Sequence, residues 1–197
     1  MPNFPALTPG QIYHVCSRGN NREDIFRAEH DRRHFLELYE QRVSPHADTF
    51  AYCLLPNHFH LLVRFRDSEP VPPSPPSRML GDMLNAYARS FNLDHSRVGA
   101  LFQRPFRRIV VRSQAQLVHV VVYIHRNPEH HGLQRDFIRW QYSSYQALLA
   151  TRATRLQRDD VLAWFGGRDG FIACHDLPSP TKPDAALLLE HDPAPTT

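Results

Sequence analysis

The stretch FAYCLLPNHFHLLVRF, residues 50–65, decides the fold because it predicts two neighbouring β-strands. Phe50–Leu55 and His58–Phe65 are rich in the aromatic and aliphatic residues that favour strands. Between them, Pro56-Asn57 is typical of a short hairpin turn. We therefore expect an antiparallel pair of strands in the middle of a sheet.

Strands and helices alternate on both sides of this hairpin. Helices are predicted over Glu29–Arg42 and Ser77–Leu93, where apolar residues recur at helical spacing. Further strands are predicted over Ile12–Ser17 and Phe106–Val111. The resulting order, β-α-β-β-α-β, is the split βαβ pattern. The expected fold class is therefore α+β, with a ferredoxin-like antiparallel sheet and helices on one face.

The segment after the last predicted strand suits two interpretations. Ser113 is a good N-cap for a helix over Gln114–Arg126, which Asn127-Pro128 would stop. The valine-rich run Leu117–Val122 could equally form a buried strand. We favour the helix because the segment is long and lies between a cap and a stop signal.

The remaining sequence predicts a small helical C-terminal appendage. Short helices are expected over Ser143–Ala150 and Asp159–Phe165. The domain organisation predicted from this pattern has a main domain at 1–135 and a helical subdomain at 136–176. An acidic, proline-rich tail at 177–197 is expected to be disordered.

Basic residues are distributed unevenly along the 197-residue chain. Of the 23 basic residues 22 are arginine, whose guanidinium can bind a phosphate through two hydrogen bonds. A GC-rich genome would produce the same preference for arginine. Residues 1–158 hold 21 arginines against 13 acidic residues, a net charge of +8, whereas residues 159–197 carry −5. This split predicts an anionic partner for the basic body.

Three further features predict a cytoplasmic protein. No run of about 18 apolar residues is present, which argues against a membrane span. The N-terminal sequence MPNFPALTPG lacks the charged and apolar regions of a secretory signal. Cys16, Cys53 and Cys174 form no C-x-x-C pair, and an odd number of cysteines suits free thiols in a reducing compartment.

His58 and His60 are candidate metal ligands. Side chains alternate along a strand, so these two histidines share one face and lie about 7 Å apart. Two imidazoles on one side of a rigid strand can share a divalent metal. The alternative is that both histidines merely line a polar cleft, and an H-x-H pattern by itself does not decide between the two.

Tyr123 and Asn127, in the segment YIHRNP, form a second candidate group. If the segment is helical, these residues are one turn apart and share a face. The helix then presents a phenol and an amide beside its apolar stripe. The simpler alternative is a boundary tyrosine followed by an asparagine that caps the helix.

Five separated stretches within residues 11–149 resemble one protein family. They are YHVCSRGNNREDIF (Tyr13–Phe26), YCLLPNHFHLLVR (Tyr52–Arg64), LFQRPFRRIVV (Leu101–Val111), YIHRNPEHHGL (Tyr123–Leu133) and WQYSSYQAL (Trp140–Leu148). The chain resembles the REP-associated tyrosine transposases of bacterial genomes, which are single-tyrosine HUH transposases. The family fold is ferredoxin-like, in agreement with the predicted order of elements.

The resemblance implies a metal-dependent enzyme that nicks and joins single-stranded, hairpin-bearing DNA. His58 and His60 match the HUH histidines, and Tyr123 matches the nucleophile that forms a 5′-phosphotyrosine. Asn127 stands where relatives place a third polar ligand, often Gln, Asp or Glu. The implied cofactor is Mg²⁺ or Mn²⁺, which would polarise the scissile phosphate. Whether the protein acts as a monomer or a homodimer stays open.

Candidate DNA-binding residues gather in two basic segments and on one predicted helix. They are Arg18, Asn20, Asn21, Arg22, Arg89, Arg104, Arg107 and Arg108. Arginine and amide side chains can bind phosphates and base edges. For each arginine, simple exposure to solvent is the alternative interpretation.

Two other functional classes stay possible at this point. A ferredoxin-like sheet with arginines and aromatic residues could bind single-stranded nucleic acid without cutting it. A hydrolase could use His58 and His60 with water as the nucleophile. Neither class would form a covalent bond between tyrosine and DNA.

Overall fold

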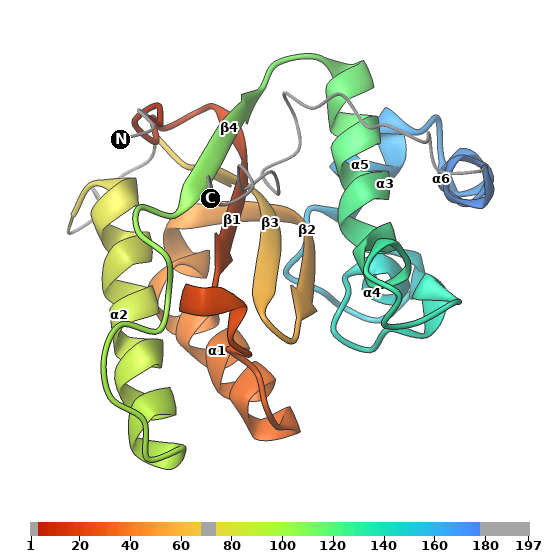
Figure 1. Ribbon diagram of the computed structural model, residues 1–197. Helices are drawn as coiled ribbons and strands as arrows, with labels where there is room; N and C mark the ends of the chain where they lie inside the picture. Colours follow the sequence, from red (N-terminus) through yellow and green to blue (C-terminus); the bar gives the residue numbers. More distant parts are fainter. Residues whose placement is uncertain (1–3, 68–73, 178–197) are drawn as a thin grey trace, which may run out of the picture.

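The computed structural model describes residues 4–67 and 74–177, and its centre is a four-stranded sheet with the strand order β2-β3-β1-β4 (Figure 1). The strands are β1 (Ile12–Arg18), β2 (Ala47–Leu55), β3 (His58–Phe65) and β4 (Arg107–Val111). Every neighbouring pair of strands is antiparallel. The predicted hairpin therefore forms, and β3 and β1 are the inner strands.

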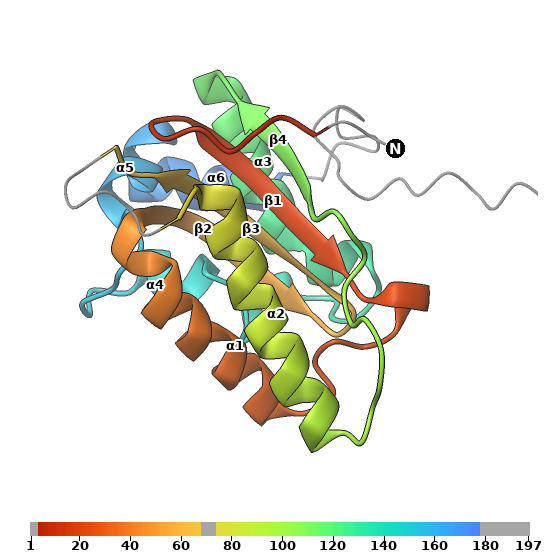
Figure 2. The same cartoon turned by 90° about the vertical axis from the view of Figure 1, so that its left-hand side faces the viewer.

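One face of the sheet packs against α1 (Glu29–Arg42) and α2 (Pro76–Asp94), which lie side by side (Figure 2). Val15, Phe59 and Leu61 of the inner strands share one apolar core with both helices. The strands and α-helices begin in the order β1-α1-β2-β3-α2-β4. This order and packing confirm the predicted ferredoxin-like α+β class.

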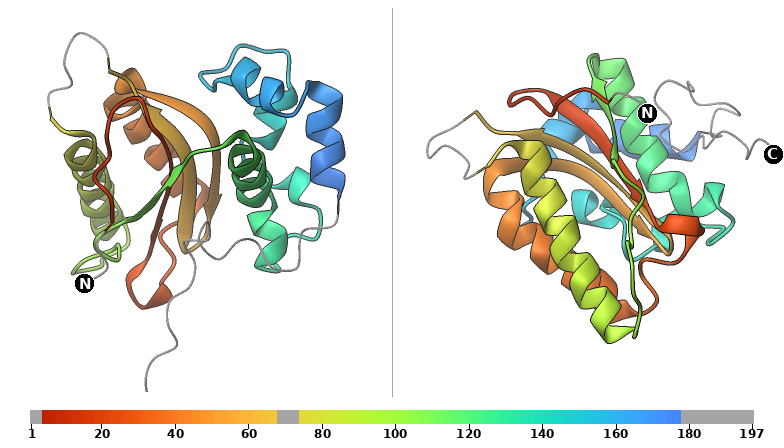
Figure 3. Two further views of the ribbon diagram at one scale, coloured as in Figure 1. Left: turned by 90° about the horizontal axis from the view of Figure 1, so that it is seen from above. Right: turned by 60° about the vertical axis from the view of Figure 1, so that its left-hand side comes forward.

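The later helices lie on the opposite side of the sheet from α1 and α2 (Figure 3). They are α3 (Gln114–His130), α4 (Tyr145–Leu149), α5 (Arg158–Trp164) and α6 (Arg168–Asp176). A second core joins them to Phe50, Leu62 and Val111 of the sheet. The prediction that α1 and α2 share one face of the sheet is correct. The structure shows a second helical layer on the other side.

The segment from Gln114 onward forms a helix and not a strand. Ser113 caps it as predicted, because its side chain accepts a hydrogen bond from the Gln116 N–H at 3.2 Å. The predicted end before Asn127 is wrong, since α3 continues through Pro128 to His130. Proline removes only its own N–H, and the N–H of His131 still bonds the carbonyl of Asn127 at 3.0 Å, so the last turn closes.

The C-terminal helices include one that the sequence did not predict. α6 follows Gly166-Gly167, whose φ angles of 73° and 112° favour glycine. A Cβ at Gly170 would lie 2.0 Å from the carbonyl oxygen of Phe165, so glycine also permits the close packing of α6. Single 3₁₀ turns occur within the described residues at η1 (Asn20–Arg22), η2 (Ser44–His46) and η3 (Phe137–Arg139).

The predicted domain organisation divides the chain after residues 135 and 176. The tail expected at 177–197 lies outside the described residues except for Leu177. The boundary between 1–135 and 136–176 stays a prediction, and residues from both parts contribute to the second core. None of the described helices combines the length and apolar character needed to cross a membrane.

Candidate functional site

A row of polar side chains lies on the α3 face of the inner strands. His58 and His60 of β3 pair with Arg18 and Cys16 of β1. Residues paired across antiparallel strands point to the same face, and so does His14, one alternation before Cys16. The three histidines are at most 1% exposed. The two predicted ligands are therefore joined by a third buried histidine.

α3 places Tyr123 against this row. The centroid of the Tyr123 ring lies 5.6 Å from that of His60 and 6.0 Å from that of His14, and both contacts are edge-to-face. His131, which follows α3, packs against His58 with ring centroids 4.7 Å apart. The C-terminal half of α3 thus runs along the start of β3.

Asn127 lies between these two contacts along α3. It is fully buried, and its Nδ2 donates a hydrogen bond to the carbonyl oxygen of Tyr123 at 2.9 Å. Its Oδ1 is also buried and accepts no hydrogen bond from any described residue. A buried acceptor without a donor is costly, and a cation can offset that cost.

Hydrogen bonds hold both predicted histidine ligands through Nδ1. Nδ1 of His58 lies 2.6 Å from Oδ1 of Asn57, and because an amide oxygen only accepts, the proton is on Nδ1. Nδ1 of His60 lies 2.9 Å from Nε2 of His14. Metal-binding histidines usually carry such a bond on the ring nitrogen that faces away from the metal. Coordination here would therefore use Nε2 of both rings.

This donor set fits a divalent cation. Two imidazole nitrogens and the amide oxygen of Asn127 are neutral ligands, so an ion held by them would keep its full charge for a phosphate. Imidazole and amide donors are compatible with Mn²⁺, and the amide oxygen also suits Mg²⁺. The residues present thus agree with the metal that the family resemblance implies.

His14 is the residue near the site that sequence reasoning missed. The alternation along Tyr13-His14-Val15-Cys16 indicates only that His14 and Cys16 share a face. Its hydrogen bond to His60 depends on the pairing of β1 with β3, which no local pattern reveals. With that pairing known, the alternation would have identified it.

The predicted DNA-binding loop is joined to a second loop. The main-chain N–H of Asn20 bonds the carbonyl of Leu101, and its side chain bonds the carbonyl of Ala100, at 2.9 and 2.8 Å. Asn21 and Arg22 are exposed and adopt left-handed φ angles of 53° and 61°. Asn20 therefore holds the loop in shape, while the next two side chains face solvent.

The predicted arginines do not form one cluster. Arg18 of β1 is the strand partner of His58 in β3, and Arg107 of β4 is the strand partner of Cys16 in β1. Both arginines therefore flank the histidine row formed by His14, His58 and His60. Arg89 and Arg104 instead line a groove of about 750 Å³ between α2 and residues 99–106.

Arg108 lies on the opposite face of β4 from Arg107. Its guanidinium donates to the carbonyl oxygens of Pro5 and Phe4 and lies over the Phe106 ring, 5.0 Å from the centroid. The structure thus separates Arg108 from the histidine row and ties it to the N-terminal segment.

The fold and this geometry define a class: a ferredoxin-like α+β protein with a histidine pair on an inner strand and a tyrosine on the facing helix. No protein-family model matches the chain. The chain is 27% identical over 117 residues to a Haemophilus influenzae protein with the provisional name REP-associated tyrosine transposase. The match covers 56% of this chain and 66% of the relative, which is just under two thirds of its length.

A solved structure shares the fold. It is described as a REP-associated tyrosine transposase bound to a REP hairpin, and it superposes with a TM-score of 0.58 at 17% sequence identity. The superposition covers 77% of this chain and 87% of the other. The structural likeness confirms the fold, and the curated relative confirms the family resemblance that the five sequence stretches indicate.

Proposed function

We propose that this protein nicks and rejoins single-stranded DNA bearing REP-like hairpins through a covalent 5′-phosphotyrosine at Tyr123. The observation that carries the proposal is the contact between the Tyr123 and His60 rings, 5.6 Å apart, on the face that also holds His58. The name of the curated relative supports a DNA-processing enzyme. The solved structure of similar fold is described as bound to a REP hairpin, which supports DNA as the partner.

Tyr123 supplies the nucleophile in this proposal. Its phenolic oxygen forms a bond to phosphorus while the bond from phosphorus to the 3′ oxygen of the leaving strand breaks. The phenol loses its proton, and the 3′ oxygen gains one. A free tyrosine has a pKa near 10, so only about one phenol in a thousand is ionised at neutral pH and the attack needs assistance. The phosphotyrosine conserves the phosphodiester energy, so a 3′ hydroxyl can reverse the step without ATP.

His58, His60 and Asn127 are the residues that would hold Mg²⁺ or Mn²⁺. When bound, the ion polarises a non-bridging oxygen of the scissile phosphate. The chain fixes the donors: Asn57 and His14 bond Nδ1 of the two histidines, and the hydrogen bond from Asn127 to the carbonyl of Tyr123 directs its amide.

We further propose that DNA contacts the exposed side chains of η1 and the arginines beside the histidine row. Asn21 and Arg22 offer an amide and a guanidinium at the surface, and Arg18 and Arg107 flank the row. Such groups bind phosphates and base edges. Arg89 and Arg104 provide further positive charge along the groove beside α2.

The proposal is tested with a hairpin oligonucleotide labelled at its 3′ end, incubated with the full chain and Mn²⁺ and resolved under denaturing conditions. The wild-type protein is expected to retain the label covalently. Tyr123→Phe is expected to retain none, because it removes the nucleophilic oxygen and little else. Tyr142→Phe is the matched control and should retain as much label as the wild type.

The same experiment separates the rival classes. A hydrolase that uses water would cut the DNA and leave the protein unlabelled. A binding module without catalysis would shift the hairpin in a native gel, with or without chelator, and leave it intact. Either result, or an adduct that persists in Tyr123→Phe, contradicts the proposal.

A further inference from the structure

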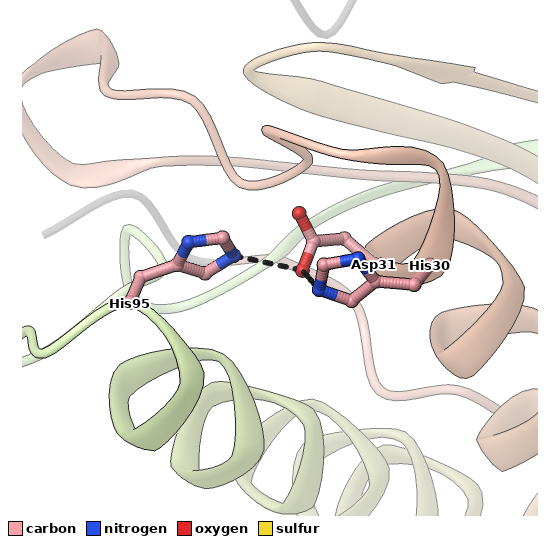
Figure 4. A group of neighbouring side chains, drawn as sticks. All are labelled: His30, Asp31 and His95. Carbon is pink, nitrogen blue, oxygen red and sulfur yellow. Dashed lines mark hydrogen bonds and ion pairs between the residues drawn. The ribbon is translucent and has the colours of Figure 1, made fainter.

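The N-terminal end of α1 meets the C-terminal end of α2, and three metal-ligating side chains converge there. His30 and Asp31 belong to the first turn of α1, and His95 follows the last residue of α2. Figure 4 shows the two imidazoles approaching the carboxylate from different sides. One donor atom of each residue lies within 4.8 Å of the other two. The group lies among the helices on the other side of the sheet from α3.

One carboxylate oxygen faces both imidazoles. Nε2 of His95 lies 2.9 Å from Oδ1 of Asp31, and Nε2 of His30 lies 3.5 Å from the same oxygen. The two rings are almost parallel, with an interplanar angle of 14° and centroids 6.0 Å apart. An ion pair needs only one of these nitrogens, whereas a cation could bind all three donors at once.

Asp31 is fixed through its second oxygen. Oδ2 accepts the main-chain N–H of Arg27 at 2.8 Å and that of Ala28 at 2.7 Å, and the residue is only 3% exposed. Burial acts to raise the pKa of this carboxyl, but the hydrogen bonds from His95, Ala28 and Arg27 lower it below the usual value. The side chain is therefore an anionic ligand held in position before any ion arrives.

The two separations between Asp31 and the imidazoles suit a small transition metal. Tetrahedral zinc, with bonds of about 2.0–2.1 Å, places neighbouring ligand atoms about 3.4 Å apart. The separations of 2.9 and 3.5 Å from Oδ1 lie on either side of that value. The side chain of His30 is 59% exposed, so its ring can adjust and water can reach the open coordination position.

We propose that His30, Asp31 and His95 form a binding site for a divalent transition metal, with Zn²⁺ as the preferred ion. Imidazole ligands favour Zn²⁺ over Mg²⁺, which prefers oxygen donors. The bound ion would tie α1 to α2. Close beyond His95, Arg97 pairs with Glu23 at 2.9 Å, next to η1. Zinc at this position would thus stiffen the end of the fold that carries the proposed DNA-binding loop.

The test is a zinc titration of the chelator-treated full chain, followed by calorimetry and by thermal unfolding. Zinc should bind the wild type and raise its unfolding midpoint, because only the folded chain assembles the three donors. His30→Ala and His95→Gln should each weaken this binding about 10-fold or more. His34→Ala, a histidine one turn further along α1, is the matched control and should keep both effects.

Two comparisons keep this site distinct from the proposed active site. His58→Ala should retain the zinc binding described here, and His30→Ala should retain covalent adduct formation. His30 is exposed, so His30→Ala should fold like the wild type and lose only a metal ligand. Indistinguishable zinc titrations for the two proteins would therefore overturn the proposal. The proposal would also be overturned if His58→Ala lost this zinc binding while His30→Ala kept it. The calorimetric result does not depend on the proposed DNA chemistry.

Discussion

Two groups of buried histidines lie in or beside α3, and they differ in the hydrogen bonds that their ring nitrogens form. His14, His58 and His60 lie on the sheet beside Tyr123. His125 of α3 and His175 of α6 lie in the second core, both fully buried. Each group joins elements that are distant in sequence, yet only one of them faces the tyrosine.

The His125–His175 group forms a closed chain of hydrogen bonds. Nδ1 of His175 lies 2.8 Å from the carbonyl oxygen of Phe171, which can only accept, so that nitrogen carries the proton. Nε2 of His175 then accepts from Nδ1 of His125, and Nε2 of His125 accepts from the hydroxyl of Ser144, each at 2.8 Å. Every ring nitrogen has a protein partner when both imidazoles are neutral.

Burial and clustering therefore do not by themselves decide what a histidine does. In the closed chain, hydrogen bonds within the protein use both nitrogens of each ring, so the group stabilises the fold. At His58 and His60, Asn57 and His14 bond Nδ1, which is the arrangement expected of metal ligands that coordinate through Nε2. We therefore propose that His58 and His60 serve the DNA chemistry, whereas His125 and His175 stabilise the fold.

Replacing one histidine in each group gives the largest expected effects. His60→Ala should reduce adduct formation by the folded protein about 100-fold or more, the scale of losing one electrostatic stabiliser from an active site, in addition to the stability it loses as a buried side chain. His125→Ala should lower the free energy of unfolding by about 2–4 kcal/mol, because it leaves a cavity and deprives Ser144 and His175 of a partner.

Urea unfolding and a single-turnover adduct assay, both carried out on folded protein, measure the two effects. The comparison fails if His125→Ala abolishes adduct formation without loss of stability, or if His60→Ala unfolds the chain while the folded fraction stays active.

The next largest effect is a loss of stability in acid, through the closed chain of His125 and His175. Burial lowers the pKa of His175 to about 4, and burial together with His175 lowers the pKa of His125 well below its usual value. The unfolded state, with histidine pKa values near 6.5, therefore binds more protons from about pH 6.5 down to pH 4. The free energy of unfolding should fall as the pH drops through this window, by about 3 kcal/mol for His175.

Urea unfolding at several pH values measures this slope in the wild type and in His175→Gln, which cannot titrate at that position. The variant should be less stable near neutral pH but lose less stability on acidification. Equal slopes in the two proteins would contradict the role assigned to His175.

His14 should have an intermediate effect as a positioning residue. His14→Phe keeps the size of the ring but removes the hydrogen bond to Nδ1 of His60, and it should weaken Mn²⁺ binding about 10-fold or more. His14→Gln can restore a hydrogen bond and should recover part of the affinity. Mn²⁺ titration followed by electron paramagnetic resonance measures both values. Equal affinities in His14→Phe and the wild type would show that the bond does not position His60.

The smallest effect is expected at the exposed loop. Arg22→Ala should weaken hairpin binding several-fold and lower the slope of log affinity against log salt by about 1, because one phosphate contact is lost. Arg33→Ala removes an exposed arginine of α1 and serves as the control. Fluorescence anisotropy at several salt concentrations gives both slopes, and identical slopes would exclude a phosphate contact at Arg22.

Local patterns predicted most of the fold. β3 and α1 have the predicted bounds His58–Phe65 and Glu29–Arg42, because strand alternation and helical spacing belong to the segment itself. The end of α3 was wrong because Pro128 is a strong stop signal, whereas packing of the helix against the sheet sustains one more turn. α6 was missed because its start at Gly166-Gly167 resembles a simple turn.

The candidate site was predictable only in part. Strand alternation places His58 and His60 on one face, but the distance from Tyr123 to His60 depends on how α3 packs on the sheet. The family resemblance, and not any local pattern, brought those residues together in advance. The group of His30, Asp31 and His95 depends on the meeting of two helix ends, which the sequence does not encode locally.

Mass spectrometry of the covalent adduct identifies the nucleophile directly. The wild-type protein is incubated with a hairpin oligonucleotide and Mn²⁺, then digested with nuclease and protease, and the modified peptide is sequenced. We expect a single nucleotide-bearing residue, Tyr123, linked through a 5′ phosphate. A modification on another tyrosine, such as Tyr52 or Tyr142, or cleaved DNA with no modified peptide, would contradict it.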